Sequence, residues 1–292
     1  MDRIATFSII GRDPETSELG VAVQSKFLGA GSVVPWARAE AGAIATQAAA
    51  NLDYGEIGMF LLSKGYPADK VLRALLALDD GREERQIGIV DARGGSVSFT
   101  GRECMNWAGG LSGPNFAAQG NILVGEETVK ALARTFQETG GPLARRLVTA
   151  LDRAQDAGGD RRGRQAAGLL VVKEKGSYGG YNDKYIDLRV DDDPEPIKRL
   201  IHLLDLHELY FSKTAPEDML EAKGSVAEQI QAALSRLGYY AGPASGAFDG
   251  RTKAAFRSFS GVENFEERLL QGDFVDRKVF EFLLGKAELS AR

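Results

Sequence analysis

The chain has 292 residues, and its 43% hydrophobic content is ordinary for a globular protein with a full core. A formal net charge of −5 argues against nucleic-acid binding, which needs a basic surface to meet phosphates. A single cysteine, Cys104, and two histidines fit neither a disulfide nor the common zinc motifs, so we expect no metal and no cofactor. Without a secretion signal or a run of about 20 apolar residues, we expect a cytoplasmic protein that does not enter membranes.

The first hundred residues combine strands with one pair of helices. β-branched and aromatic residues predict a hairpin of strands at 4–11 and 18–25. Small residues predict a tightly packed strand at 41–48. The remaining elements expected here are helices at 53–63 and 67–77 and a hairpin of strands at 85–91 and 96–100.

The next hundred residues repeat this mixture. A strand is expected at 116–124, and apolar residues at helical spacing predict helices at 126–138 and 142–157. Strands at 166–173 and 186–190 and a helix at 196–209 follow. Antiparallel hairpins combined with helix pairs favour an α+β layered domain over a parallel βαβ sheet.

The C-terminal part has a separate pattern. Residues 211–224 are polar and mixed, which is typical of a linker. Helices expected near 226–237, 252–260 and 276–284 would form a compact three-helix module. The expected organisation is therefore a first domain at 1–210, a linker at 211–224 and a helical domain at 225–292.

The stretch Gly158-Gly-Asp-Arg-Arg-Gly-Arg-Gln165 carries four formal charges and three glycines, and it leads directly into a strand expected to be buried. One interpretation is a solvated turn. The other is a rigid loop lining a pocket, in which Arg162 binds a carboxylate by forked hydrogen bonds and Asp160 holds it in place. Gln165 would then contribute to substrate binding.

Several stretches of residues 6–209 are distinctive: Thr6-Phe-Ser-Ile, Leu19-Gly-Val-Ala-Val, Ala45-Thr-Gln, Gln86-Ile-Gly-Ile-Val-Asp91, Phe99-Thr-Gly, Gln119-Gly-Asn121, 158–165 and Leu188-Arg-Val-Asp-Asp192. On these stretches, residues 6–209 resemble the family known as domain of unknown function 1028. The resemblance implies an N-terminal-nucleophile (Ntn) hydrolase-like fold, a four-layer α-β-β-α sandwich. It implies more about fold than about activity.

Ntn hydrolases attack with the side chain of a chain-terminal Thr, Ser or Cys, whose own α-amine is the general base. Thr6 is the residue at the resembling position, and five residues precede it. These would have to be removed to free the amine. The alternative is a strand threonine with a locally bonded hydroxyl. The window 31–38 has Arg38 as its only basic residue, so the lysine-assisted mechanism of proteasome-like members does not carry over intact.

Four more polar residues are candidates for the site. Ser25 and Thr46 could face a pocket beside Thr6, and Gln119 and Asn121 could orient a substrate amide or build an oxyanion hole. The alternative for Ser25 and Thr46 is a buried hydroxyl bonded to the sheet backbone, and for Gln119 and Asn121 a pair of amides that satisfy turn backbone. The leading hypothesis is an amidohydrolase acting on a small carboxylate-bearing amide or N-acyl compound. The alternative is a non-catalytic protein that binds a small anion or a partner, and in either case we expect a homo-oligomer.

The C-terminal region contains Leu237-Gly-Tyr-Tyr-Ala-Gly-Pro243, Gly246-Ala-Phe-Asp-Gly250 and a charged run at 263–268. On these stretches, residues 225–287 resemble a peptidoglycan-binding module. It implies a small helical bundle. A docking role within or between proteins is the more natural expectation here, with peptidoglycan as the weaker alternative.

Overall fold

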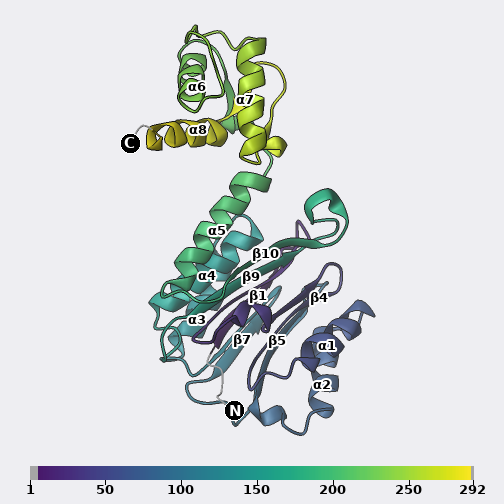
Figure 1. Cartoon of the computed structure of the whole chain (residues 1–292). Helices are drawn as coiled ribbons and strands as arrows, with labels where there is room; N and C mark the ends of the chain where they lie inside the picture. The colour runs from purple at the N-terminus through teal and green to yellow at the C-terminus, as the bar shows by residue number, and fades with distance from the viewer. Residues whose placement is uncertain (1–5, 291–292) are drawn as a thin grey trace. The chain divides into compact units, whose positions relative to one another are not determined.

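The computed structural model describes residues 6–290, so the ends at 1–5 and 291–292, including the start of the strand expected from residue 4, lie outside the described residues. The protein is a mixed α+β structure with antiparallel sheets and a C-terminal helical region (Figure 1). It divides into two compact units, Met1–Leu204 and Asp205–Arg292.

The first unit contains a six-stranded antiparallel sheet in the order β10-β9-β2-β1-β8-β7. The strands are β1 (Thr6–Arg12), β2 (Leu19–Ser25), β7 (Gly109–Gly113), β8 (Phe116–Asn121), β9 (Ala166–Val172) and β10 (Lys184–Val190). β1 lies between β2 and β8, and all but its last residue are buried. The first strand of the chain is therefore central in this sheet.

A second antiparallel sheet has four strands in the order β3-β4-β5-β6. They are β3 (Pro35–Arg38), β4 (Gly42–Ala48), β5 (Arg85–Asp91) and β6 (Ser96–Thr100). Every residue of β4 is buried, in keeping with its run of small residues. β3 and β7, which lie at sheet edges, are the two strands of this unit that the sequence pattern did not predict.

Helices cover both sheets. α3 (Glu127–Glu138) and α4 (Leu143–Asp156) share a core with the six-stranded sheet, and α5 (Pro196–Phe211) joins that core through its first turns. α1 (Asp53–Ser63) and α2 (Ala68–Ala77) share a core with the four-stranded sheet. Short 3-10 turns add η1 (Ala30–Ser32), η2 (Arg82–Glu84) and η3 (Tyr178–Gly180).

A third core cluster combines residues of the two sheets. Ile10 and Val23 of one sheet lie in it with Ala43 and Ala45 of the other. Because side chains alternate along a strand, β1 sends Phe7 and Ile9 into the helix-covered core and Ile10 into the cluster between the sheets. Thr6 and Ser8 have the same phase as Ile10, which directs their side chains toward the second sheet.

The second unit contains α6 (Ser225–Arg236), α7 (Gly250–Val262) and α8 (Arg277–Leu289) around its own apolar cluster. It also has η4 (Pro216–Asp218), η5 (Glu266–Arg268) and a two-stranded ladder of β11 (Met219–Glu221) and β12 (Phe274–Asp276). The stretch 211–224, expected as a linker, thus holds a strand and a turn. None of the helices within residues 6–290 has the length and apolar character needed to span a bilayer.

Candidate functional site

Three polar residues lie side by side on the central strands. Thr6 pairs with Ser25 on one side and with Asn121 on the other, and directly opposed residues project to the same face of a sheet. The Thr6 hydroxyl donates a hydrogen bond of 3.1 Å to the Ser25 oxygen. All three residues are essentially fully buried. Three of the residues that the sequence nominated are therefore neighbours.

Side-chain amides of the four-stranded sheet form hydrogen bonds with Thr6, Asn121 and the neighbouring Gly120. Gln47 Nε2 donates to the Thr6 carbonyl at 3.3 Å and to Gln86 Oε1 at 2.8 Å. Asn121 Nδ2 donates to the same Gln86 oxygen at 3.0 Å. Gln86 Nε2 in turn donates to the Gly120 carbonyl at 2.8 Å. A fully buried amide is costly unless it is bonded, and these contacts satisfy it while linking the two sheets.

Ser8 continues the row one step along β1. Its hydroxyl donates to Gln47 Oε1 at 2.6 Å and accepts from Gln119 Nε2 at 2.7 Å. Gln119, nominated from the sequence together with Asn121, thus reaches Thr6 only through Ser8 and Gln47. We call these seven residues the intersheet polar cluster: Thr6, Ser8, Ser25, Gln47, Gln86, Gln119 and Asn121.

Two residues beside this cluster have left-handed backbone. Ala48 follows Gln47 with φ 69°, and Ile122 follows Asn121 with φ 53°. A β-branched side chain is rare in this region because its Cβ crowds the backbone, and such strain gathers at functional sites. Ala48 is the last residue of β4, and Ile122 directly follows β8, so both lie at the end of the sheets that holds Thr6. This end of the two sheets is the candidate active site.

The charged loop 158–165 is fixed to the same end of the six-stranded sheet. The buried Asp160 carboxylate accepts hydrogen bonds from Lys26 N and Arg162 N, both at 2.8 Å, and lies 3.3 Å from the Arg162 guanidinium. Leu123, just past β8, forms a bridge with Asp160. The loop is therefore bound to the ends of β2 and β8, and the Arg162 side chain remains 34% exposed.

Glycine is required in this loop. Gly158, Gly159 and Gly163 have φ values of 124°, 62° and 110°, a region that residues with a Cβ enter with strain. The positive φ values allow the backbone to place the Asp160 carboxylate against Lys26 N, so the glycines and the charges of this loop serve one conformation.

Two nominated residues lie elsewhere. Thr46 projects from the face of β4 opposite to Gln47, because side chains alternate along a strand, and its hydroxyl donates to the Asn51 carbonyl at 3.2 Å. The Gln165 amide donates to Asp192 at 3.0 Å. The structure brings neither of them to Thr6.

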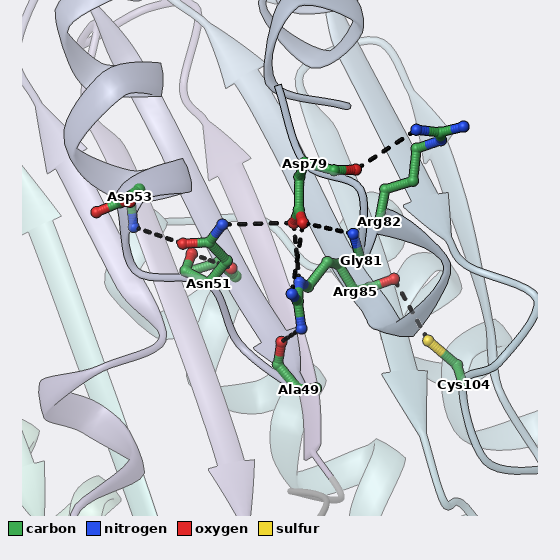
Figure 2. Close-up of polar contacts among 9 residues, drawn as sticks. Ala49, Asn51, Asp53, Asp79, Gly81, Arg82, Arg85 and Cys104 are labelled. Carbon is green, nitrogen blue, oxygen red and sulfur yellow. Dashed lines mark hydrogen bonds and ion pairs between the residues drawn. The ribbon is translucent and has the colours of Figure 1, made fainter. Parts of the chain in front are cut away.

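A second polar group lies at the end of β4 and the start of β5 (Figure 2). The Asp79 carboxylate accepts from Arg85 Nε at 2.9 Å and from Gly81 N at 2.8 Å, and Arg85 also donates to the Ala49 carbonyl. The hydrogen bond from Arg85 is the main cause that lowers the pKa of Asp79 to about 2. Burial and the Asp79 carboxylate raise the pKa of the nearby Tyr54 hydroxyl.

This Asp79–Arg85 pair holds the segment that follows strained Ala48. Arg85 binds Ala49, and Asn51 Nδ2 donates to Asp79 at 3.4 Å. Within residues 6–290, no group of three or more His, Cys, Asp or Glu side chains is arranged to hold a metal ion.

Two family models match the sequence of this chain. Residues 6–200, two thirds of the chain, match the model of the family described as "Family of unknown function (DUF1028)". The chain belongs to the DUF1028 family. Residues 210–283 match a second model, described as "Putative peptidoglycan binding domain".

One solved DUF1028 structure is similar over most of its length. The crystal structure of protein SPO2555 from Silicibacter pomeroyi has 28% sequence identity to this chain and a TM-score of 0.64. The match covers 77% of this chain and 89% of that one. No curated protein matches. The DUF1028 match thus establishes a family, and the family's description assigns no activity.

Five residues of this DUF1028 site region were not nominated from the sequence: Ser8, Gln47, Gln86, Asp79 and Arg85. A signal for three of them exists, because Ser8, Gln47 and Gln86 are polar residues next to small or apolar neighbours in strands with buried interiors. A polar residue in a buried strand needs a hydrogen-bond partner, so several such residues in neighbouring strands are expected to bond to one another. The sequence offers no such signal for the pairing of Arg85 with Asp79.

Proposed function

We propose that residues 6–204 form an Ntn-hydrolase-like domain that hydrolyses a small carboxylate-bearing amide or N-acyl compound, with Thr6 as the nucleophile. The observation that carries this proposal is the position of Thr6 in the central strand: it lies between Ser25 and Asn121, and its hydroxyl bonds to Ser25 between two sheets. Helix pairs on the outer sides of the sheets and a mixed core between them support a four-layer α-β-β-α arrangement.

The chemistry requires removal of residues 1–5, after which the Thr6 α-amine is free. An α-amine has an ordinary pKa near 8, so part of it is neutral at neutral pH and can accept a proton. It takes the hydroxyl proton while Thr6 Oγ1 forms a bond to the substrate carbonyl carbon. The C–N bond then breaks, the leaving amine takes the proton, and water hydrolyses the remaining ester to a carboxylic acid and free Thr6.

Neighbouring amides supply the means to stabilise the oxyanion of this step. A side-chain amide has two N–H donors, and the described hydrogen bonds of Asn121 Nδ2 use one of them. Asn121 is directly opposite Thr6 in the sheet register. A donor held in place before reaction stabilises developing charge without reorganisation. Gln119 holds the Ser8 hydroxyl by a hydrogen bond. Arg162, held by Asp160, is the proposed contact for the substrate carboxylate.

A β-lactone probe tests the nucleophile without a known substrate. An N-terminal threonine opens the lactone and becomes acylated, so peptide mass analysis should find the adduct on Thr6 and lose it in Thr6→Ala. Thr16→Ala, in an exposed turn, is the matched control and should label like the parent. An adduct that persists in Thr6→Ala, or that never lies on Thr6, contradicts the proposal.

A non-catalytic binding protein on the same fold is the alternative, and the closure of the intersheet polar cluster favours it. Ser8 bonds to Gln47 and Gln119, and Gln47 bonds in turn to Gln86 and the Thr6 carbonyl, as in a purely structural network. Under this alternative Thr6 is not acylated at all. The β-lactone experiment therefore separates the two.

The C-terminal unit supports a separate binding activity toward peptidoglycan. Besides the family match, it has a groove of about 270 Å³ lined by Phe248 and Phe256 together with Lys253 and Arg257. Aromatic faces suit sugar rings, and the two cations suit the carboxylates of stem peptides.

A pull-down of the full chain on insoluble peptidoglycan tests this activity. We expect retention that Phe248→Ala reduces severalfold, whereas Tyr181→Ala, an exposed aromatic of the first unit, should be retained like the parent. Equal recovery of both variants in the pellet would contradict a role for the groove, and no recovery of the parent protein would contradict peptidoglycan binding.

A further inference from the structure

A pocket of about 380 Å³ lies at the far end of β1 from Thr6. Arg12 and Asp13 at the end of β1, Asn115 in the β7–β8 turn and Arg146 in α4 contribute to its wall. A strand rises about 3.3 Å per residue, so Arg12 is roughly 20 Å from Thr6. We call this cavity the basic pocket after its two arginines; Asp13 and Glu15 line it as well. It is separate from the proposed active site.

The two arginines of the basic pocket differ in how their charges are compensated. Arg146 Nη1 lies 3.6 Å from Asp13 Oδ2, and its guanidinium carbon is 4.3 Å from the centre of the Phe136 ring. The other Asp13 oxygen accepts from the turn amides of Glu15 and Thr16. Asp13 is thus fully engaged with Arg146 and its own turn.

Arg12 has no such carboxylate. Its Nη1 donates to the Asn115 side-chain oxygen at 3.3 Å, and no described residue forms an ion pair with it. Asn115 has φ 66°, so the turn that presents this oxygen adopts a left-handed conformation. A guanidinium has five N–H donors in a fixed fork, and this one uses a single donor on a neutral acceptor while lining a cavity. The exposed Glu15 is a further residue of the pocket lining.

The helix beside the basic pocket increases its positive potential. α4 begins at Leu143 with no acidic residue in its first turn and no side-chain cap, and Arg146 lies in that turn. The N-terminal end of a helix carries partial positive charge, so cations there are unfavourable unless an anion is close. Gly140 and Gly141, just ahead of the helix, line the pocket as well.

We propose that the basic pocket binds a small organic carboxylate. The carboxylate is held by the Arg12 fork, and the apolar part lies against Pro14 and Pro114, which line the pocket and are exposed. The planar carboxylate matches two parallel N–H donors of a guanidinium, which gives the site a preference over neutral isosteres.

Benzoate is a suitable probe, titrated into the full chain and followed by amide NMR shifts, with benzamide as its neutral isostere. We expect saturable shifts at residues 12–16 and 113–116 with benzoate and none with benzamide. Arg12→Gln should weaken benzoate binding by about tenfold or more, the loss expected for a charge-assisted hydrogen bond. Arg12→Lys retains the charge without the fork, so its benzoate affinity should lie between those of the parent and Arg12→Gln.

Arg38→Gln is the matched control, because it removes the same charge at the end of another strand, and it should bind benzoate like the parent. Shifts elsewhere in the chain, equal affinity in Arg12→Gln, or no saturation with benzoate would overturn the proposal. Tighter binding of inorganic phosphate than of benzoate would overturn the assignment to carboxylates. Because none of these variants touches Thr6, failure here leaves the amidohydrolase proposal intact.

Discussion

At the residue scale, the cluster between the sheets explains why polar residues interrupt apolar strands. Gln86 uses both ends of its amide: the oxygen accepts from Gln47 and Asn121, and the nitrogen donates to Thr100 and the Gly120 carbonyl. Bonded in this way, a buried amide fixes the register of one sheet against the other. It also sets the position of Asn121 beside Thr6, on which the proposed chemistry depends.

The Asp79–Arg85 pair leads to a prediction with a defined pH dependence. The pKa of Asp79 falls from 3.8 to about 2 in the folded protein, chiefly through its hydrogen bond with Arg85. A lowered folded pKa stabilises the protein above the unfolded value, and the contribution is lost as the pH falls from about 4 towards 2. Because both side chains are largely buried, solvent screens the pair little.

We therefore expect Asp79→Asn to lower the free energy of unfolding by about 2 kcal/mol at pH 7, as follows from about 1.4 kcal/mol per pKa unit. Urea unfolding of both proteins between pH 7 and pH 3 should show the difference shrinking below about pH 4. Asp69→Asn, from an exposed pair with Arg73, is the control and should change little. A difference that stays constant with pH contradicts the account.

At the element scale, strands and helices with clear periodicity were predictable from the sequence. The hairpin of β1 and β2, strands β4, β5 and β6 and helices α1 to α4 occur within a few residues of their expected positions. β3 and β7 were missed for physical reasons. β3 begins with Pro35, and β7 is Gly-Gly-Leu-Ser-Gly, so each has the composition of a loop and becomes a strand only by pairing at a sheet edge.

The candidate site was predictable in part for the same reason. Ser25 was expected beside Thr6, whereas Asn121 was nominated without a position relative to them. The meeting of all three depends on strand register, which becomes visible only once three strands are paired. Thr46 was nominated from the same reasoning, but one residue along a strand reverses the direction of the side chain. Its neighbour Gln47 faces Thr6 instead.

The helices of the C-terminal unit depend on a buried ion pair. Asp276 Oδ1 caps α8 by accepting from Lys278 N and Val279 N, and Oδ2 accepts from Arg268 at 2.6 Å. The two side chains are at most 1% exposed. Removing one partner leaves a buried charge without compensation, which is among the most destabilising changes in a protein.

Asp276→Ala should therefore destabilise the C-terminal unit by about 3–5 kcal/mol. Hydrogen exchange of the amides of α6, α7 and α8 in the full chain measures this directly, as a loss of protection confined to residues 205–290. Asp249→Ala removes only the cap of α7, where Asp249 accepts from Thr252 N at 2.8 Å, and should cost about 1 kcal/mol. Similar small effects of both changes would show that the pair contributes little.

At the scale of the whole molecule, the chain joins a DUF1028 domain to a helical unit with its own core. The first unit has two distinct ends. One holds Thr6, the intersheet polar cluster and the loop fixed by Asp160, and the other holds the basic pocket around Arg12. The α+β class with antiparallel sheets and the family were both predicted from the sequence, whereas the basic pocket has no local motif, because its residues come from four separate segments.

If Thr6 acts as an N-terminal nucleophile, residues 1–5 must be removed, and the intact mass of the protein purified after expression of the full chain measures this removal. We expect a mass lower than that of the full chain by residues 1–5, with Thr6 as the first residue. Retention of residues 1–5 in the purified protein would leave Thr6 without a free α-amine and contradict the account.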